Sequence, residues 1–598
     1  MRTALVWKSK DPTRQQPLQV ANLLEQRFAP LFKKPPKSEV LAAGDVHVAL
    51  LRLLVVGWRP SFLEHGPKKA DGAHGDFAFA TDYPLNAGQV LDAASRKEGT
   101  LLPLGRGLER DPATYLRELA PPFAMLWSHG DELFVQTDGL GQGHWFEYED
   151  DHVWAVTNRI GALCALGITL DPIPEDWAVR FTLGWFTGDS TGYRGVRLLD
   201  PGTQLRIDRD GVHKKRTHVL TEWVHPDPMS RADSLELART SFAAVLGEAA
   251  AQWDNASVGL SGGWDSRAVA AVLRTLDVNY ELRVRGHPQR LDVMIANELA
   301  RMAKLPIRIK TKGGVPPTTA AGARACIERA LLWQSGHMTM LKHKTFLAKR
   351  GVMDGGVINV MGQHSGTGKA DFAVKIKADT LEPAQYEDAL VDAMMKDAPP
   401  VLLGELCDHV RERIRAAYRK AEDYELTGLH RLHFFFLYEY TRRWGAATIN
   451  AQNGMVVAPF LNPGFIRAAY AFAPEELPNK PFHSYITNHY APDWGAYAYE
   501  DQFSYQDVLN GCGIPPADVQ IDEEKDLPPW RRGKRWGKYN QMIYWEMVGA
   551  SLVEEALDSS GAAGFWREIF DPGLVREHWN KSKGVADALV IAHLLPRG

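Results

Sequence analysis

Ser257-Val-Gly-Leu-Ser-Gly-Gly-Trp-Asp-Ser-Arg267 is the stretch of the sequence that decides the fold. An apolar strand from Ser257 breaks into the turn Ser261–Ser266, and an Ala-rich helix begins near Arg267. Two adjacent glycines permit a sharp turn, and the first amides of the helix point unpaired into it. A strand, a glycine turn and a helix N-terminus in this order predict a seat for a phosphate group.

The side chains of this turn add hydrogen-bond donors and a metal ligand. Ser261 and Ser266 supply hydroxyl groups, and Asp265 supplies a carboxylate that can hold Mg²⁺ together with phosphate oxygens. The spacing differs from Gly-x-x-x-x-Gly-Lys-[Ser/Thr], so the turn is not a Walker loop. Trp264 either packs under an adenine or fills the core. We predict nucleotide contacts along the whole segment: Leu260, Ser261, Gly262, Gly263, Trp264, Asp265 and Ser266.

The composition of the chain is that of an ordinary globular protein. Of its 598 residues 45% are hydrophobic and 24% charged, and a formal net charge of −4 argues against a general nucleic-acid binder. The cysteines form no C-x-x-C pair, so neither a zinc site nor a disulfide framework is indicated. No segment approaches the roughly 20 apolar residues that span a bilayer. We therefore expect a cytoplasmic protein with neither nucleic acid nor a membrane as partner.

The pattern of apolar and polar residues changes once along the chain. Up to about residue 220, short apolar runs alternate with turns, as in the hairpin pattern from Phe123 to Thr137. From Ser257 onward the pattern predicts a parallel sheet with helices on both faces and ligands at the carboxyl ends of its strands. The charged block from Ala373 to Tyr424 predicts a solvated helical insertion. The predicted elements are a strand 257–260, a helix 267–276, a strand 280–284, a helix 291–304 and a strand 307–310.

Several segments together resemble the asparagine-synthetase superfamily of ATP pyrophosphatases. Besides the Ser261–Ser266 turn they are Leu291-Asp-Val-Met-Ile-Ala-Asn-Glu-Leu-Ala300, Ala458-Pro-Phe-Leu-Asn-Pro463, Glu475-Glu-Leu-Pro-Asn-Lys480, Thr137-Asp-Gly-Leu-Gly141 and Gly195-Val-Arg-Leu-Leu-Asp-Pro-Gly202. The resemblance implies a glutaminase-like Ntn-type αββα sandwich over residues 1–225. It implies a doubly wound ATP pyrophosphatase domain with helical insertions over residues 226–598. ATP and Mg²⁺ are the implied cofactors. Asp292 either binds the nucleotide, as the resemblance implies, or only complements the dipole of its helix.

The chain departs from this family at residue 2. Glutamine-hydrolysing members carry a nucleophilic cysteine there after removal of Met, whereas this chain has Arg2 and its first cysteine is Cys164. A guanidinium has no usable lone pair at neutral pH and cannot be a nucleophile. We therefore expect the glutaminase reaction to be absent and the N-terminal domain to be a structural or substrate-binding relic.

Two branches of the family that this chain resembles also lack the nucleophilic cysteine. They are the β-lactam synthetases and the lasso-peptide cyclases. Both adenylate a carboxylate and let an amine of the same molecule displace AMP. The resemblance thus implies a ligase that forms AMP and pyrophosphate and closes a macrolactam in a ribosomal precursor peptide. The implied partners are a leader-peptide recognition protein and a leader peptidase. A small-molecule lactam or amide synthetase, an ammonia-dependent asparagine-type synthetase and a non-catalytic ATP-binding scaffold are the alternatives.

A second departure concerns the loop that completes the family's magnesium site. This chain offers Met361-Gly-Gln-His-Ser-Gly-Thr-Gly-Lys-Ala-Asp-Phe372, which can be matched in two registers. If Gly368-Lys-Ala-Asp371 is the match, Asp371 joins Asp265 as a magnesium ligand. If Gly362 begins the match, Gly362 lies at the nucleotide and no carboxylate falls at the expected place.

The proposed chemistry also needs a cation and a base. Lys480, Lys525 and Lys534 are candidates for the lysine that contacts pyrophosphate, and the choice falls between Lys525 and Lys534. Glu439 with Tyr438 is the candidate that takes a proton from the attacking amine. The alternative is that Glu439 pairs with Arg442 or Arg443 at helical spacing.

Overall fold

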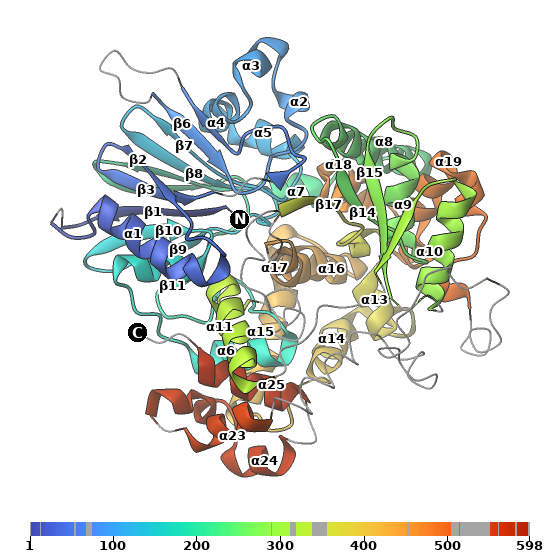
Figure 1. Cartoon of the computed structure of the whole chain (residues 1–598). Helices are drawn as coiled ribbons and strands as arrows, with labels where there is room; N and C mark the ends of the chain where they lie inside the picture. The colour runs from blue at the N-terminus through green and yellow to red at the C-terminus, as the bar shows by residue number, and fades with distance from the viewer. Residues whose placement is uncertain are drawn as a thin grey trace.

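The computed structural model describes residues 2–595 apart from 12, 53–54, 67–74, 287, 289, 311–318, 338–355, 397, 451, 453, 504–513, 515–549, 560 and 580–582. Its elements form a mixed α/β architecture with two antiparallel sheets and one parallel sheet (Figure 1). This confirms the expectation of a mixed α/β chain that contains a parallel sheet.

The two antiparallel sheets lie in the N-terminal part of the chain. One has the strand order β11-β9-β10-β1-β3-β2 and the other the order β13-β12-β8-β7-β6-β5. The hairpin expected between Phe123 and Thr137 is present as the pair β7 and β8. The strands are β1 (Thr3–Ser9), β2 (Ser38–Ala43), β3 (Val46–Leu51), β5 (Leu63–His65), β6 (Phe77–Ala80), β7 (Ala124–His129), β8 (Glu132–Thr137), β9 (Phe146–Glu149), β10 (Val153–Thr157), β11 (Val196–Leu198), β12 (Thr203–Asp208) and β13 (Gly211–Arg216).

These sheets pack face to face with helices outside them. Alternating residues of each strand point to one side, so Val6 of the first sheet and Leu126 and Val135 of the second meet in one buried cluster. Helix α1 (Pro17–Phe28) covers the outer side of β2 and β3. Helix α4 (Leu101–Arg110) covers β5, β6 and β7. The result is a stack of helix, sheet, sheet and helix (Figure 1).

The parallel sheet has the order β16-β15-β14-β17-β18. Its strands are β14 (Ala256–Gly259), β15 (Tyr280–Arg285), β16 (Ile307–Lys310), β17 (Gly356–Val360) and β18 (Met455–Val457). Helices α9 (Trp264–Leu273) and α10 (Leu291–Met302) follow β14 and β15. The direction of winding reverses between β14 and β17, which makes the loops after these two strands the expected place for a ligand.

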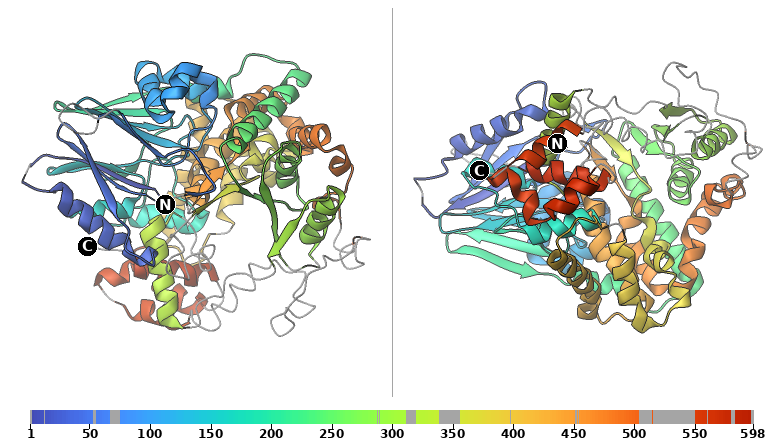
Figure 2. Two further views of the ribbon diagram at one scale, coloured as in Figure 1. Left: turned by 45° about the horizontal axis from the view of Figure 1, so that its top comes forward. Right: turned by 90° about the horizontal axis from the view of Figure 1, so that it is seen from below.

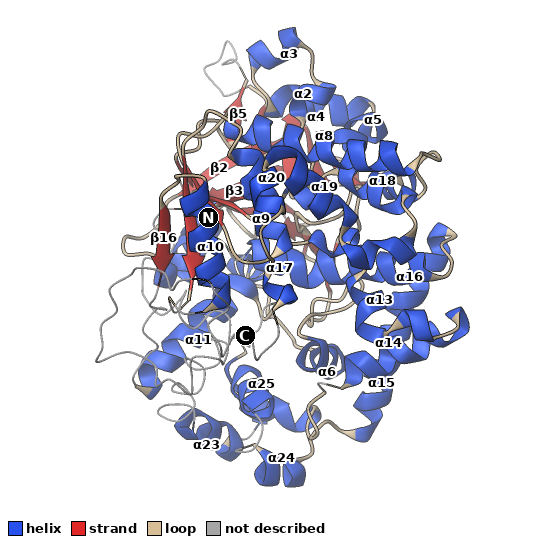
Figure 3. Ribbon diagram, turned by 90° about the vertical axis from the view of Figure 1, so that its right-hand side faces the viewer, coloured by secondary structure: helices blue, strands red, loops and turns tan. Residues whose placement is uncertain are grey.

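The two faces of this sheet differ in chemistry. Apolar side chains on one face contact α9 and α10, and these helices lie in front of the strands in Figure 3. The other face carries Ser257, Gly259, Glu281, Arg283, Arg285, Arg308, Lys310 and Asn359. Helix α11 (Ala320–Gln334), which follows β16, packs against the N-terminal part and the C-terminal helices instead. We expected helices on both faces of the sheet, but α9 and α10 contact the same face and α11 does not pack on the other face.

A short strand joins the two parts of the chain. β4 (Val55–Val56) pairs in parallel with Gly356 and Val357 of β17. Beside it, Asp254 N donates to Gly57 O at 2.7 Å and Arg59 N donates to Gln252 O at 3.0 Å. Gly57 has φ +80°, and a Cβ there would lie 2.9 Å from Asn255 O, so glycine permits this close approach.

Helices make up most of the described chain after β17. The predicted helical insertion contains α14 (Tyr386–Met395) and α15 (Gly404–Arg419). It leads to the π-helix η7 (Phe435–Gly445), in which the wider i→i+5 pattern runs for 11 residues. The C-terminal helices α23 (Ala550–Asp558) and α25 (Lys583–Leu594) pack beside α11 (Figure 2). Among the described residues, no helix combines the length and apolarity that crossing a bilayer requires.

Candidate functional site

The turn Ser261–Ser266 links β14 to α9 at the point where the sheet reverses. Gly263 is the N-cap of α9, and no side chain caps that end of the helix. Ser261 N donates to Ser266 Oγ at 2.9 Å, the two hydroxyls are 2.8 Å apart, and Gly263 N donates to Ser261 Oγ at 3.1 Å. The serines thus fix the shape of the turn, and the N-terminus of α9 keeps its partial positive charge for an anion.

Asp265 lies between two cationic or donor groups. Lys369 Nζ is 3.0 Å from both carboxylate oxygens, and His483 Nε2 is 3.1 Å from Oδ1. Burial would raise the pKa of Asp265, but His483 and Lys369 outweigh it and hold the pKa well below its usual range. Asp265 is therefore a carboxylate at neutral pH.

The loop after β17 lies directly against this turn. A Cβ on Gly362 would come within 2.7 Å of Asp265 C and 2.8 Å of Ser266 N, so only glycine fits there. A Cβ on Gly366 would lie 2.5 Å from Asp371 Oδ2, which places the Asp371 carboxylate over the bare backbone of Gly366. Gly362 thus meets the turn and Asp371 folds back over the same loop, and the choice between the two registers expected from the sequence stays a prediction.

The two carboxylates fit a magnesium ion that is also bound by phosphate. Loss of water around its carboxyl group raises the pKa of Asp371, Lys369 opposes this, and the Asp265 charge adds to it. Two mutually repelling carboxylates with one lysine near them are a donor set that a divalent cation would stabilise. In the described ranges, no group of three or more His, Cys, Asp or Glu side chains could hold a metal by itself. Asp265 and Asp371 would need phosphate and water oxygens as further ligands.

Asp292 contacts the turn rather than pointing away from it. Its Oδ1 accepts from Gly262 N at 2.9 Å, and Glu500 N donates to Gly262 O at 3.0 Å. Burial, a hydrogen bond to Asp292 and the Asp292 charge raise the pKa of Glu500 to about 7. Asp292 and Glu500 therefore both bind the backbone of Gly262 in the turn. The sequence did not predict the contact of Glu500.

Trp264 takes neither of the two roles expected for it. Its ring stacks on Tyr499 with centroids 3.4 Å apart, and its Nε1 donates to the carboxylate of Asp501 at 3.0 Å. Lys480 lies 4.9 Å above the indole ring and pairs with Asp501. Leu260 is 1% exposed and belongs to the hydrophobic core. Trp264 and Lys480 therefore contact the segment 499–501. Leu260 lies in the core.

Arg267 fastens the residues just before this segment, Trp494–Ala498, to the turn Ser261–Ser266. It is buried, and its guanidinium donates to Trp494 O, Tyr497 O, Ala498 O and Gly262 O at 2.7–3.2 Å. The guanidinium also lies 3.6 Å above the Tyr499 ring. One side chain therefore ties the turn Ser261–Ser266, called the phosphate turn below after the ligand expected for it, to a segment more than 200 residues later in the sequence.

A cavity of about 620 Å³ opens beside the turn. Ser261, Gly263, Asp265, Ser266 and Gly362 form one side of it. Arg283, Arg285, Asn359 and Gln452 form another part of its lining. Its size is within the range of small-molecule sites, and it holds most of the predicted nucleotide contacts in one place.

Arg2 is buried near the start of β1. Its guanidinium is 2.9 Å from Asp82 Oδ1, lies 3.8 Å above the Phe62 ring and donates to Gly454 O at 3.4 Å. The cavity beside it has a volume of about 20 Å³, room for about one water molecule. Arg2 therefore fills the place where the family resemblance would put a glutaminase nucleophile.

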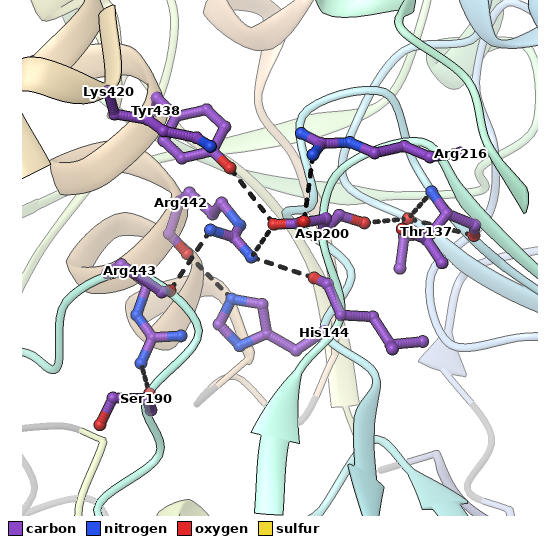
Figure 4. Close-up of polar contacts among 12 residues, drawn as sticks. Thr137, His144, Ser190, Asp200, Arg216, Lys420, Tyr438, Arg442 and Arg443 are labelled. Atoms are coloured by element: carbon purple, nitrogen blue, oxygen red, sulfur yellow. Dashed lines mark hydrogen bonds and ion pairs between the residues drawn. The ribbon is translucent and has the colours of Figure 1, made fainter. Parts of the chain in front are cut away.

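Tyr438 and Glu439 do not line the cavity at the phosphate turn. They belong to η7 and line a separate cavity of about 260 Å³ with Thr187, Asp200 and Arg413. Tyr438 Oη donates to Asp200 Oδ1 at 3.3 Å, and Asp200 also pairs with Arg216 at 3.1 Å (Figure 4). Glu439 accepts from Gly188 N at 3.2 Å, and Arg443 and Arg442 counter the rise in its pKa that burial causes. The two arginines thus act on Glu439 through their charge, but the pairing expected at helical spacing is not observed: Arg442 pairs with Asp200 at 3.7 Å and Arg443 donates to Phe186 O at 2.7 Å.

Lys525 and Lys534 lie outside the described residues. Among the described residues, Lys369 is a cation beside Asp265 that sequence reasoning missed. Its signal was available, since Lys369 stands two positions before Asp371 in a glycine-rich loop after a strand. His483 and Glu500 gave no such signal, because only the folded chain brings residues this distant in sequence to the turn.

No protein-family model matches the chain, and no curated protein matches it. One similar solved structure is described as the allosteric regulatory enzyme of purine biosynthesis, with 11% identity, 53% of this chain and 82% of that chain covered, and a TM-score of 0.25. Another is glutamine phosphoribosylpyrophosphate amidotransferase from B. subtilis with ADP and GMP, with 11% identity, coverages of 53% and 83%, and a TM-score of 0.24. Likenesses this weak carry no argument about fold or function.

Proposed function

We propose that the protein is an ATP-dependent, AMP-forming amide-bond synthetase that adenylates a carboxylate and couples it to an amine. The observation that carries the proposal is the turn Ser261–Ser266 at the reversal point of a parallel sheet, with an uncapped helix N-terminus and the ionised Asp265 facing one cavity. Backbone amides and a carboxylate able to hold Mg²⁺ are the groups that bind a triphosphate.

The chemistry assigns a role to each group of the site. A substrate carboxylate oxygen attacks the α-phosphorus of ATP, and the bond from that phosphorus to the bridging oxygen breaks. The N-terminus of α9 and Lys369 stabilise the departing pyrophosphate, while Asp265 and Asp371 would hold Mg²⁺, which neutralises charge on the phosphates. The amine then attacks the acyl carbon, the bond from that carbon to the AMP oxygen breaks, AMP leaves, and the amine's proton passes to solvent.

We further propose that the amine belongs to the substrate itself. Arg2 stands in place of the nucleophile, and the cavity beside it has room for about one water molecule and not for glutamine, so the N-terminal part is then an inactive Ntn-type, glutaminase-like domain. Macrolactam closure of a ribosomal lasso-type peptide fits this loss. A precursor peptide, a leader-peptide recognition protein and a leader peptidase are the partners that such a reaction requires, and a small-molecule lactam or amide synthetase is the alternative within the same chemistry.

One observation favours a different class of function. Lys369 contacts both oxygens of Asp265, the carboxylate that should bind a metal ion. If this ion pair persists when ATP is present, the protein is an ATP-binding scaffold rather than an enzyme.

Substrate-dependent exchange of pyrophosphate into ATP tests the proposal. Linear precursor peptides and small amino acids would be compared in the wild type, in Asp265→Asn and in the matched control Asp254→Asn, which removes an exposed carboxylate. We expect exchange in the wild type and control, loss of at least 100-fold in Asp265→Asn, and a product one water lighter by mass spectrometry. ATP binding without exchange for any acid would indicate the scaffold.

A further inference from the structure

Two pairs of like charges face each other on the polar side of the parallel sheet. Arg283 of β15 is in register with Arg308 of β16, and Arg285 is in register with Lys310. Like charges directly opposite on neighbouring strands destabilise a sheet. Because side chains two residues apart share a face, all four cations gather on the same side.

The described carboxylates do not balance this cluster. Glu281 is 3.9 Å from Arg283 and 3.6 Å from Arg308. Partial burial lowers the pKa of Lys310, the charges of Arg283, Arg285 and Arg308 lower it further, and Glu281 opposes them. Among the residues that the structure describes here, four positive charges beside one negative charge make a surface that an anion would stabilise.

The cluster lies beside the phosphate turn but not on it. Arg283 and Arg285 line the same cavity as Asp265, and Asn359 Oδ1 accepts from Arg283 at 3.2 Å and helps to hold that side chain. The phosphate turn and Gly362 belong to the loops after β14 and β17, whereas the cations lie on β15 and β16, on the other side of β14. The cations are thus placed for an anionic group additional to the triphosphate.

We infer that this basic face binds an acidic segment of the acid substrate, which therefore carries further carboxylates near the one that is activated. The inference rests on the proposed function and narrows its substrate class. Arginine forks match carboxylates with two hydrogen bonds, and the cluster is compact, with two residues on each of two strands. A nucleic acid would need a longer row of cations, and the chain has a net charge of −4.

Binding of a fluorescein-labelled hexaglutamate peptide to the full chain, followed by fluorescence anisotropy, tests the inference without catalysis. The variant Arg308→Gln/Lys310→Gln removes two charges of the cluster. The matched control Arg194→Gln/Arg301→Gln removes two exposed arginines elsewhere. We expect affinity that falls with added salt, a loss of at least tenfold in the first variant, and a change within twofold in the control. Equal affinity in all three proteins would overturn the inference.

Two further measurements distinguish an acidic segment from a nucleotide or a nucleic acid as the ligand of this face. ATP affinity should be unchanged in Arg308→Gln/Lys310→Gln, and a parallel loss of ATP affinity would assign the cations to the nucleotide and overturn the inference. Tighter binding of an oligothymidylate than of hexaglutamate would overturn it in favour of a nucleic acid. If every acid fails to support pyrophosphate exchange while hexaglutamate binding still depends on Arg308 and Lys310, the proposed function fails and the acidic-ligand surface stands.

Discussion

Lys369 Nζ lies 3.0 Å from both oxygens of Asp265, so an ammonium group is placed where a metal ion would compete for the same carboxylate. Asp265 lies in the first turn of α9, after β14, and Lys369 lies in the loop after β17, where Gly362 permits the close approach to Asp265 and Ser266. In the proposed function, Mg²⁺ would displace Lys369 from Asp265, and the displaced lysine would then reach a phosphate.

Replacing Lys369 tests this competition. In Lys369→Gln, pyrophosphate exchange should fall at least tenfold because a cation near the leaving group is lost. The Mg²⁺ concentration for half-maximal exchange should also fall, because nothing competes for Asp265. A magnesium titration measures both effects, with the exposed Lys377→Gln as control. An unchanged magnesium requirement would show that the two cations do not share the carboxylate.

Gly362 should be intolerant of any side chain. The Cβ of Gly362→Ala would lie within 2.8 Å of backbone atoms of Asp265 and Ser266, which cannot rotate away as a side chain could. We expect ATP affinity, measured by equilibrium dialysis, to fall at least tenfold. Gly247→Ala is the control, since a Cβ there meets nothing within 4 Å. Equal affinities would mean that the two loops separate easily.

The ion pair of Arg2 and Asp82 should matter for stability. Arg2→Met leaves the buried carboxylate of Asp82 without its partner, which typically costs about 3 kcal/mol of unfolding free energy. Arg2→Met/Asp82→Asn should recover part of this loss, as a double-mutant cycle in urea would measure. Arg194→Gln, at an exposed pair, should cause no measurable change. Additive effects of the two substitutions would contradict the coupling.

Glu500 should make the stability of the fold depend on pH. Its pKa is raised to about 7 from the ordinary 4.5, mainly by burial and then by Asp292. The folded state therefore binds the Glu500 proton more tightly than the unfolded state does. The protonated carboxyl group stabilises the fold fully below about pH 4.5, and this stabilisation is lost as the pH rises through 7. The melting temperature of the wild type should fall more between pH 5 and 8 than that of Glu500→Gln. Exposed Glu405→Gln should keep the wild-type profile.

Local patterns predicted the parallel sheet and its first helices closely. The strand Ile307–Lys310 has the expected bounds, and the helix expected at Leu291–Lys304 ends two residues earlier, at Met302. Helix α9 begins at Trp264 rather than near Arg267, because the turn closes with the serine hydroxyls and frees its last residues for the helix. These elements follow from side-chain periodicity and from glycine, which act over a few residues.

Long-range contacts account for what the sequence did not predict. Trp264 does not line the cavity, because its ring stacks on Tyr499 and its Nε1 donates to Asp501. Both partners are more than 230 residues later in the sequence. Glu439 is drawn toward Gly188 in the N-terminal part, away from the phosphate turn. The basic face was missed because the register of β15 with β16 aligns its cations, and periodicity within one strand does not give that register.

The pairing of β4 with β17 makes the two parts of the chain a single mechanical unit. A protease that cuts between Arg216 and Arg231 would break one covalent link, yet the fragments would stay together through the backbone hydrogen bonds at Gly57 and Arg59. In residues 226–598 expressed alone, Gly356 and Val357 would lose their pairing with β4, so this half of the chain is expected to aggregate rather than to fold as an independent module.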